Sequence, residues 1–260
     1  MAGRCPLSQT PVGNVVEIFS GIQGEGILVG RRQVFLRLSG CNLRCEYCDT
    51  PLSRSPRDYC LVQSGPEGEH SQRAANPLTI EQVTSFVAAL TRPNMLQPAL
   101  TVTGGEPLCQ AGFLAALLPE LRKLGIETML ETNGALPDEL AKLLPHVERV
   151  AMDIKLASCM GQPVRYEDNR RFLELSRNHG LFVKMVVCAK TTESELQEAL
   201  RVVRSVDPGI VVVLQPVTTI PHRGIETPSS AQLLRFERCA SEIVKNVRVI
   251  PQVHKLLGAR

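Results

Sequence analysis

The alternation of short apolar runs with segments of helical spacing is the feature that most constrains the fold of this 260-residue chain. The apolar runs are rich in β-branched residues, and this order is typical of βα units that build a parallel sheet. The runs predict six strands, at Val34–Leu38, Ala99–Thr103, Glu127–Glu131, Arg149–Asp153, Leu181–Val187 and Ile210–Val217. The spacing predicts helices over Leu108–Leu124, Pro137–Leu144, Glu167–His179, Thr192–Ser205 and Ser229–Asn246.

Six strands joined by helical crossovers predict an α/β fold, a partial (β/α)6 TIM-like barrel. With 43% hydrophobic residues the chain can bury one full core, so we expect a single domain over residues 1–260. Residues 51–77 interrupt the alternation with Ser, Pro, Gly and mixed charge, and we expect a surface excursion there. In such folds ligands bind beyond the carboxyl ends of the strands.

The charge and the cysteine content exclude several classes of protein. The net charge of +3 comes from 29 basic and 26 acidic residues without a long basic run, so no nucleic-acid surface is predicted. Nine cysteines, odd in number and clustered once, do not form the pattern of a disulfide framework. No apolar segment has the length of a signal peptide or a membrane span. We therefore expect a soluble, cytoplasmic protein.

Three cysteines, Cys41, Cys45 and Cys48, lie within eight residues and carry the strongest chemical signal in the sequence. Three thiolates hold three corners of a four-iron cluster and leave the fourth iron open for chemistry. Structural zinc sites generally take four ligands from two separated pairs, and no second pair exists here. A zinc site or simple packing is the alternative. The remaining cysteines are scattered singly, at Cys5, Cys60, Cys109, Cys159, Cys188 and Cys239.

The spacing of the three cysteines, with Tyr47 just before the third, resembles the radical S-adenosylmethionine (SAM) superfamily. The resemblance implies a [4Fe–4S] cluster on these cysteines, with SAM bound at the open iron and contacted by Tyr47, Cys48 and Asp49. The cluster and SAM together generate an adenosyl radical, and the protein supplies geometry and a cavity poor in water. Tyr47 could equally be a core residue.

The second motif is Thr103-Gly104-Gly105-Glu106-Pro107, where a predicted strand ends and a helix opens with proline. On its own this would be an ordinary turn between a strand and a helix. Downstream of the cysteines it resembles the superfamily's loop for the amino group of SAM. Gly105 and Glu106 would then supply a carbonyl and a carboxylate as acceptors.

Two further strand ends bring polar residues to the same level, at Asp153-Ile154-Lys155 and Gln215-Pro216-Val217-Thr218. We expect both segments to bind SAM. Lys155 can pair with the carboxylate of the methionine moiety, while Asp153 and Gln215 can hydrogen-bond to the amine or the ribose hydroxyls. The alternative is a surface ion pair and an ordinary strand-end turn.

Segments near both ends of the chain narrow the resemblance to the 7-carboxy-7-deazaguanine synthase family. The segments are Ile18–Gly26, Arg37, Cys48–Thr50 and Pro251–Gly258, and the likeness spans nearly the whole chain except residues 51–77 and the first dozen residues. The resemblance implies a carbon–nitrogen lyase that converts 6-carboxy-5,6,7,8-tetrahydropterin to 7-carboxy-7-deazaguanine with loss of ammonia, in queuosine and deazapurine biosynthesis.

The family likeness also implies how the pterin is bound. The segment 14–30 would form part of the substrate site, and Arg37 would pair with the pterin carboxylate through its planar guanidinium. Without the resemblance, Gln23–Gly26 would be a glycine-rich turn and His254 a structural histidine. The full set of expected substrate residues is Ile22, Gln23, Gly24, Glu25, Arg37, Thr103, His254 and Arg260, the last through its terminal carboxylate.

Other implications of the resemblance are Mg²⁺ bound by Thr50, a flavodoxin or ferredoxin as reductant, and a homodimer. A glycyl-radical enzyme activase is the alternative within the superfamily, because its cluster loop is similar to Gly40–Cys45. A non-catalytic iron–sulfur regulator or electron carrier is the alternative outside catalysis. Such a protein would have no use for the Gly104–Pro107 loop.

Overall fold

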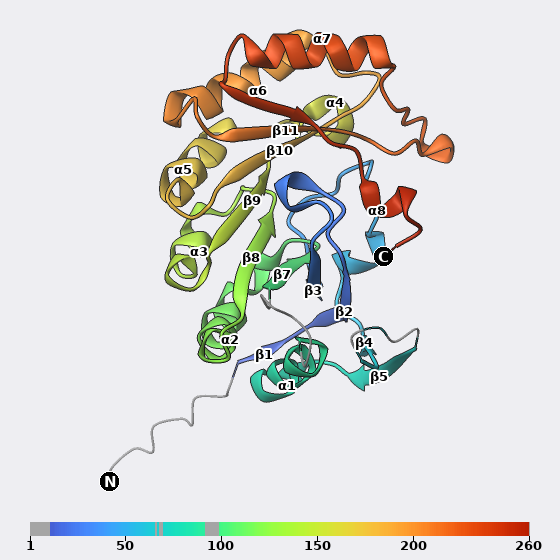
Figure 1. The fold of residues 1–260 in the computed structure, drawn as a ribbon, viewed down its shortest axis with the longest axis vertical. Helices are drawn as coiled ribbons and strands as arrows, with labels where there is room; N and C mark the ends of the chain where they lie inside the picture. The colour runs from blue at the N-terminus through green and yellow to red at the C-terminus, as the bar shows by residue number, and fades with distance from the viewer. Residues whose placement is uncertain (1–10, 66, 68–69, 92–98, 260) are drawn as a thin grey trace.

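A ten-stranded sheet forms the centre of the protein in a computed structural model, which describes residues 11–65, 67, 70–91 and 99–259 (Figure 1). The strand order is β12-β11-β10-β9-β8-β7-β3-β2-β4-β5. Neighbouring strands from β3 to β12 run parallel, as the curved sheet of a partial TIM-like barrel requires. These strands are β3 (Arg32–Leu38), β7 (Ala99–Gly104), β8 (Glu127–Thr132), β9 (Arg149–Asp153), β10 (Phe182–Val187), β11 (Val211–Pro216) and β12 (Asn246–Val249).

The first six of these parallel strands confirm the six predicted ones, with ends that differ by no more than two residues. The seventh, β12, was not predicted, and its first residue, Asn246, was assigned to the end of the last helix. That helix, α7, covers Ser230–Ser241 only, and the chain turns at Glu242 and Ile243 before it pairs with β11. As an edge strand, β12 is largely exposed and therefore lacks the apolar run that marked the other strands.

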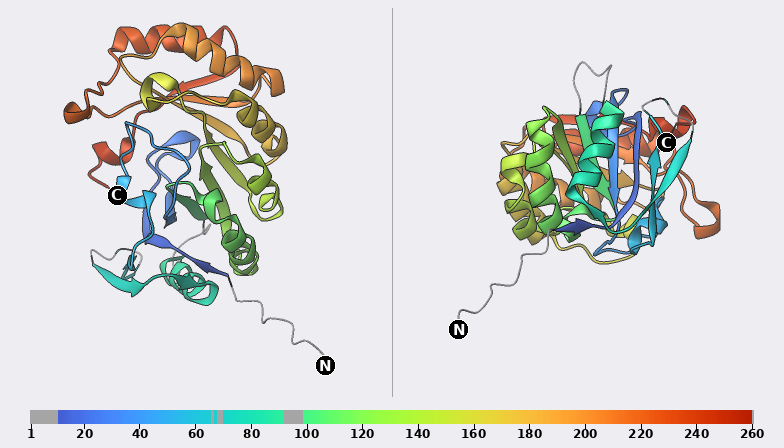
Figure 2. Two further views of the ribbon diagram at one scale, coloured as in Figure 1. Left: turned by 180° about the vertical axis from the view of Figure 1, so that it is seen from behind. Right: turned by 90° about the horizontal axis from the view of Figure 1, so that it is seen from below.

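Helices cover the outer, convex face of the sheet, and in both views of Figure 2 they lie outside the strands. None of the helices in the described ranges is both long and apolar enough to cross a membrane. The longer helices are α1 (Ile80–Thr91), α2 (Ala111–Lys123), α3 (Pro137–Ala141), α5 (Tyr166–Ser176), α6 (Glu193–Val206) and α7. Short helical turns are α4 (Ala157–Met160), α8 (Val253–Leu256), η1 (Gly26–Leu28), η2 (Pro51–Arg54), η3 (Pro107–Gln110), η4 (Leu144–His146) and η5 (Pro221–Arg223).

Helix α6 shows how the local sequence sets these elements. Thr192 caps its first turn, because the hydroxyl accepts a hydrogen bond from the amide of Glu195 at 3.2 Å. Leu196, Leu200 and Val203 are fully buried and recur at helical spacing, so one stripe of the helix packs on the sheet. The predicted helix over Thr192–Ser205 is confirmed.

The two faces of the sheet have different chemistry, because side chains alternate along each strand. On β10, Val183, Met185 and Val187 belong to the main apolar core beneath the helices. Lys184, which stands between them, points to the opposite, inner face and lines the cavity described below. The barrel is therefore packed outside the sheet and polar inside it.

Near the N-terminus the sheet gains mixed pairings. β2 (Val15–Ile22) runs antiparallel to β3, β4 (Tyr59–Gln63) is parallel to β2, and β5 (Ser71–Ala75) is antiparallel to β4. A separate two-stranded sheet joins β1 (Val12–Gly13) to β6 (Leu78–Thr79). Residues 51–77 are therefore not simply a loop. Buried Cys60 and Val62 alternate along β4, a short strand pattern that was overlooked among the polar residues.

Candidate active site

A cavity of about 630 Å³ opens on the inner face of the sheet, toward the carboxyl ends of the parallel strands. Its walls come from the loop after β3, the ends of β7, β9 and β11, the β2–β3 connection and the C-terminal segment. This volume lies in the usual range of ligand pockets. The predicted site residues that line it are Ile22, Gln23, Gly24, Glu25, Arg37, Cys41, Cys45, Tyr47, Cys48, Asp49, Thr50, Thr103, Gly105, Asp153, Lys155, Gln215, Val217, Thr218 and His254.

Four predicted site residues are not among those that line the cavity. Ile154 and Pro216 are next to lining residues, and Arg260 lies outside the described residues. Glu106 is fully buried, and its carboxylate accepts hydrogen bonds from the Thr132 hydroxyl and the Asn133 amide, both at 2.8 Å. Burial raises the pKa of Glu106. This carboxylate therefore joins the glycine loop to the end of β8, and direct contact of Glu106 with SAM stays a prediction.

Gly105 lies where the glycine loop packs against the cysteine loop. A Cβ atom at this position would be 2.3 Å from the carbonyl oxygen of Gly40 and 2.9 Å from Cβ of Cys41. The amide of Glu106 donates a hydrogen bond to the same Gly40 carbonyl at 2.8 Å. Only glycine fits so close to a neighbouring backbone, which explains why the two motifs occur together.

The three cysteines of the loop after β3 are half-buried free thiols on one wall of the cavity. Two arginines hold the loop: Arg54 donates to the carbonyl of Cys45 at 2.7 Å, and Arg223 donates to the carbonyl of Cys48 at 3.1 Å. Burial raises the pKa of the Cys41 and Cys45 thiols. No other cysteine in the described ranges lines the cavity. Three thiols on one anchored loop fit a cluster with three protein ligands.

Three buried polar atoms beside the cysteines have no hydrogen-bond partner within the described chain. They are the hydroxyl of Tyr47, Oδ1 of Asp153 and Oε1 of Gln215, and all three residues line the cavity. A buried polar atom without a partner costs free energy, so these three atoms are available to hydrogen-bond to a ligand in the cavity. The two acceptors and one hydroxyl suit a molecule that carries an ammonium and hydroxyls, as SAM does.

Lys155 is held in the same part of the cavity. Its Nζ is 2.6 Å from Oδ2 of Asp153 and 5.2 Å from the centre of the Tyr47 ring. Burial lowers the pKa of Lys155, but the charge of Asp153, its hydrogen bond to Lys155 and the nearby Cys45 and Glu25 together outweigh burial, so the pKa is raised overall. Lys155 therefore carries a positive charge that can meet a ligand carboxylate.

On the opposite wall, Gln23 belongs to a network of buried polar side chains. Its amide nitrogen donates to Glu131 at 3.0 Å and to Gln33 at 3.2 Å. The Thr103 hydroxyl donates to the other carboxylate oxygen of Glu131 at 2.9 Å. Burial raises the pKa of Glu131. Glu131 was not among the expected site residues, although its place at the end of a predicted strand was a usable signal.

Lys184 is the central cation of this wall and was also missed. Its ammonium forms a very short ion pair with Glu25 and lies 3.4 Å from Asp153. Burial raises the pKa of Glu25, but the Lys184 ammonium and the donors around the carboxylate outweigh burial and lower the pKa to about 2. Glu25 is therefore ionised at neutral pH. The signal in the sequence was a lone lysine within an apolar strand.

Arg37 lines the cavity beside an aromatic stack. Its Nε is 2.8 Å from Oε1 of Glu17, and its guanidinium carbon is 6.0 Å from the centre of the Phe19 ring. Phe19 stacks on Phe35, with 4.9 Å between ring centres. Glu17, which was not predicted, fixes the guanidinium through Nε, so that the terminal nitrogens can form a fork for a ligand carboxylate.

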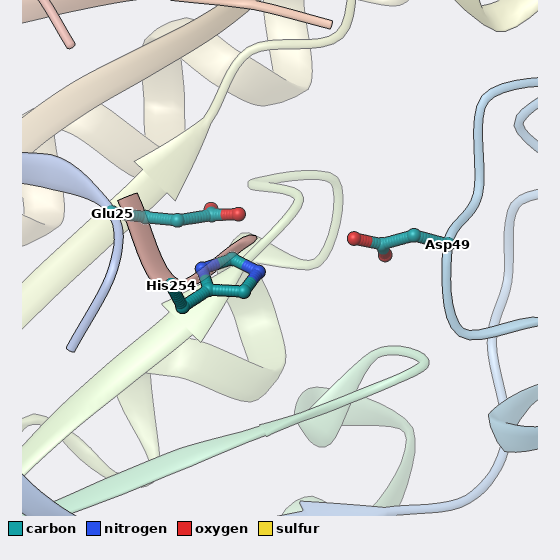
Figure 3. Close-up of side chains that lie close together, drawn as sticks. All are labelled: Glu25, Asp49 and His254. Carbon is teal, nitrogen blue, oxygen red and sulfur yellow. The ribbon is translucent and has the colours of Figure 1, made fainter. Parts of the chain in front are cut away.

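The C-terminal segment brings His254 to the mouth of the cavity. Figure 3 shows Glu25 and Asp49 pointing toward one another from opposite sides, with the His254 ring beside the gap. Ligand atoms of these three residues lie within 4.8 Å of one another, a spacing that could hold a metal ion. However, Lys184 and Lys255 already pair with the two carboxylates, at Glu25 and at Asp49 respectively. A cation at this point would have to displace both pairs.

Comparisons with known proteins agree with this geometry. The family model of the radical SAM superfamily matches residues 36–203. A 7-carboxy-7-deazaguanine synthase of Geobacter sulfurreducens is 36% identical and covers 95% of this chain and 98% of its own. The synthase of Methanopyrus kandleri is also 36% identical, with 95% and 94% covered.

Solved structures share the fold. QueE from Escherichia coli is similar with a TM-score of 0.55 and 20% identity, over 92% of this chain and 93% of that one. A radical SAM methyltransferase from Sphaerobacter thermophilus has a TM-score of 0.58 and 18% identity, over 84% of this chain and 66% of that one. Fold, cavity and close relatives agree. The chain belongs to the 7-carboxy-7-deazaguanine synthase family of the radical SAM superfamily.

Proposed function

We propose that this protein is a radical SAM lyase that converts 6-carboxy-5,6,7,8-tetrahydropterin to 7-carboxy-7-deazaguanine with loss of ammonia, in deazapurine biosynthesis. One observation carries the proposal: a single cavity has three cysteines on one wall and a network of ring-reading polar groups with Arg37 on the other. Relatives that carry the synthase name over 95% of the chain support the product.

When bound to Cys41, Cys45 and Cys48, a [4Fe–4S] cluster supplies the electron that cleaves SAM and so provides the radical that takes a hydrogen atom from the substrate. The residues around it position the cofactor. Lys155 would meet the carboxylate of the methionine moiety of SAM, and the unpartnered oxygens of Asp153 and Gln215 would accept hydrogen bonds from the amine and the ribose hydroxyls of SAM. This placement sets the distance between the two reactants, which is the protein's main contribution to rate.

The opposite wall orients the pterin. Arg37 binds the carboxylate with its terminal nitrogens, while Gln23, Glu131 and Thr103 present buried donors and acceptors to the ring edge. Because hydrogen bonds within the wall already fix these groups in place, a ring is accepted only if its own donors and acceptors match them, and this gives selectivity. We assign segment 14–30 to the substrate site, together with His254 and the terminal carboxylate of Arg260.

Other features of the family complete the proposal. We assign Mg²⁺ to the Thr50 hydroxyl, because Thr50 follows Asp49 in the cavity wall and Mg²⁺ is typically held by few protein oxygens together with those of the substrate. From the same family likeness we also propose a flavodoxin or ferredoxin as reductant and a homodimer. The proposals of a single domain over 1–260 and of a cytoplasmic location rest on the composition and cysteine pattern of the chain.

The two alternatives are less well supported. A glycyl-radical enzyme activase is not favoured by relatives that carry the synthase name along 95% of the chain. A plain electron carrier has no use for the pterin-side network of Gln23, Thr103 and Glu131.

The decisive experiment is an anaerobic assay of the reconstituted, reduced protein with SAM, Mg²⁺ and 6-carboxytetrahydropterin, with the deazapurine followed by mass spectrometry. Formation of 7-carboxy-7-deazaguanine is the expected result. An Arg37→Met variant is the matched control, since it should still cleave SAM but bind the pterin poorly. If the wild-type protein forms 5′-deoxyadenosine but no deazapurine, the substrate assignment is wrong. If it forms neither with an intact cluster, the catalytic proposal fails.

A further inference from the structure

The side chain of Gln252 lies where four separate segments of the cavity wall meet. Its Nε2 donates to Oε1 of Glu25 at 2.8 Å and to Oδ2 of Asp49 at 3.1 Å. Its Oε1 accepts from the Thr218 hydroxyl and from Nζ of Lys255, both at 2.6 Å. One amide thus uses both N–H groups and both lone pairs. It links the substrate segment, the cysteine loop, the end of β11 and the C-terminal segment.

An amide is the side chain that this position requires. Glu25 and Asp49 face each other across the gap in Figure 3, and the two N–H groups of Gln252 reach one carboxylate each. A glutamate here would put a third carboxylate between them, and a lysine could not accept the two hydrogen bonds from Thr218 and Lys255. The side chain between these carboxylates is therefore a neutral double donor.

The C-terminal segment needs this anchor because it buries little apolar surface. Leu256 is 76% exposed and Leu257 is 62% exposed. The segment is held instead by polar contacts, including a hydrogen bond from the Val253 amide to the Gly24 carbonyl at 2.9 Å. His254 packs on the substrate segment so closely that a Cβ atom on Gly24 would lie 2.2 Å from its Nδ1.

We infer that Gln252 is a positioning residue that couples the two walls of the cavity and holds residues 253–259 closed over the pterin site. It touches neither the cluster cysteines nor the proposed ring-reading groups, and it acts through Glu25 and His254. Asp49 and Thr218, its partners on the other wall, lie in the segments assigned to SAM. The inference about coupling rests on the proposed function, whereas the inference about closure does not.

Closure is tested by hydrogen exchange on the full-length protein, which needs no activity. In a Gln252→Met variant, of similar length but without the amide, the amides of Val253 and Ala259 should exchange roughly tenfold faster. Gln72→Met is the matched control, because Gln72 is exposed on the edge strand β5 and does not line the cavity. Unchanged protection in Gln252→Met would overturn the inference. If this variant does not fold, Gln252→Glu takes its place, since its carboxylate should repel Glu25 and Asp49 and also open the segment.

Coupling is tested by kinetics with the reconstituted enzyme. Gln252→Met should raise KM for the pterin roughly tenfold with a smaller effect on kcat, and more 5′-deoxyadenosine should form for each deazapurine. Its iron content should equal that of the wild-type protein. If Gln252→Met exchanges rapidly but keeps an unchanged KM and an unchanged product ratio, Gln252 closes the segment without coupling the two walls. That result would overturn the inference about coupling. If wild-type protein makes no deazapurine, the proposed function falls, while the exchange result still decides closure.

Discussion

The two walls of the cavity differ in how their polar groups are satisfied. On the cysteine wall, the Tyr47 hydroxyl, Asp153 Oδ1 and Gln215 Oε1 are buried without a partner in the described chain. On the opposite wall, Gln23 and Thr103 both donate hydrogen bonds to Glu131, and Lys184 is paired with Glu25. Under the proposed function the first wall would gain its missing hydrogen bonds from SAM, whereas the second is already organised by its own residues.

This difference separates two ways of binding. Burying acceptors without partners costs desolvation free energy on folding, and hydrogen bonds from a bound cofactor would offset that cost. A wall with a closed network loses little rotamer freedom on binding, because its side chains are already fixed. Substitutions on the first wall should thus act mainly on ligand affinity, and those on the second should also act on the stability of the fold.

The largest effect should come from the cluster ligands. A Cys45→Ser variant should lose its iron and all deazapurine formation, while the fold persists because the thiol is only half-buried. Iron content and the product assay measure this. Cys109→Ser is the control: Cys109 is exposed and does not line the cavity, so the cluster should remain. Loss of iron in the control would contradict the assignment of the cluster to Cys41, Cys45 and Cys48 alone.

The next largest effect should be a loss of unfolding free energy when a residue of the second wall is replaced. Lys184→Met removes the cation that pairs with Glu25 and lies near Asp153, and loss of one partner of a buried pair costs about 3 kcal/mol of unfolding free energy. Urea unfolding measures the change. Arg170→Met, at an exposed pair with Glu167 and Glu174, should give no measurable change. Equal effects in the two variants would contradict a buried charge network.

A smaller effect is expected from Gln215→Leu on the cysteine wall. The variant removes an unpartnered acceptor, so SAM should bind roughly tenfold more weakly while the unfolding free energy does not fall. Titration of the protein with SAM, together with urea unfolding, separates the two quantities. Unchanged SAM affinity would mean that this oxygen does not meet the cofactor.

The smallest effect concerns pH. The pKa of Glu25 is lowered from 4.5 to about 2 in the folded protein, so its stabilising contribution is fully present above pH 4.5 and is lost as the pH falls toward 2. The difference in unfolding free energy between wild type and Glu25→Gln should therefore stay constant from pH 8 to pH 5 and shrink only below. Urea unfolding at several pH values tests this. A difference that changes between pH 5 and 8 would indicate another titrating group.

The cysteine wall could be predicted from sequence because its residues follow strands as short motifs. Each of these motifs can be recognised from a few consecutive residues, as at Cys41–Cys48, Gly105 and Asp153–Lys155. The six parallel strands could also be predicted from the sequence, since they are buried on the helix side and rich in apolar residues. β12 was not predicted, because an exposed edge strand needs no run of apolar residues.

The second wall was harder to predict because its contacts join distant parts of the chain. Lys184 meets Glu25 across 159 positions, and Glu131 meets Gln23 across 108. Neither lysine nor glutamate carries a local signal for its partner, and a single lysine in an apolar strand resembles a snorkelling surface residue. Family likeness supplied Gln23 and Glu25 but not the residues that hold them.

The hydrogen bond between Gln252 and Glu25 spans 227 positions, so it links nearly the first and the last structured parts of the chain. Contacts between such distant residues are expected to form late in folding, because the entropic cost of closing a long loop comes before the contact stabilises the fold. During synthesis, the cysteine loop emerges long before the segment that covers the cavity. The contact between Gln252 and Glu25 can therefore form only after the cysteine loop and every strand of the sheet have been synthesised, so the order of the chain makes closure of the cavity a late step.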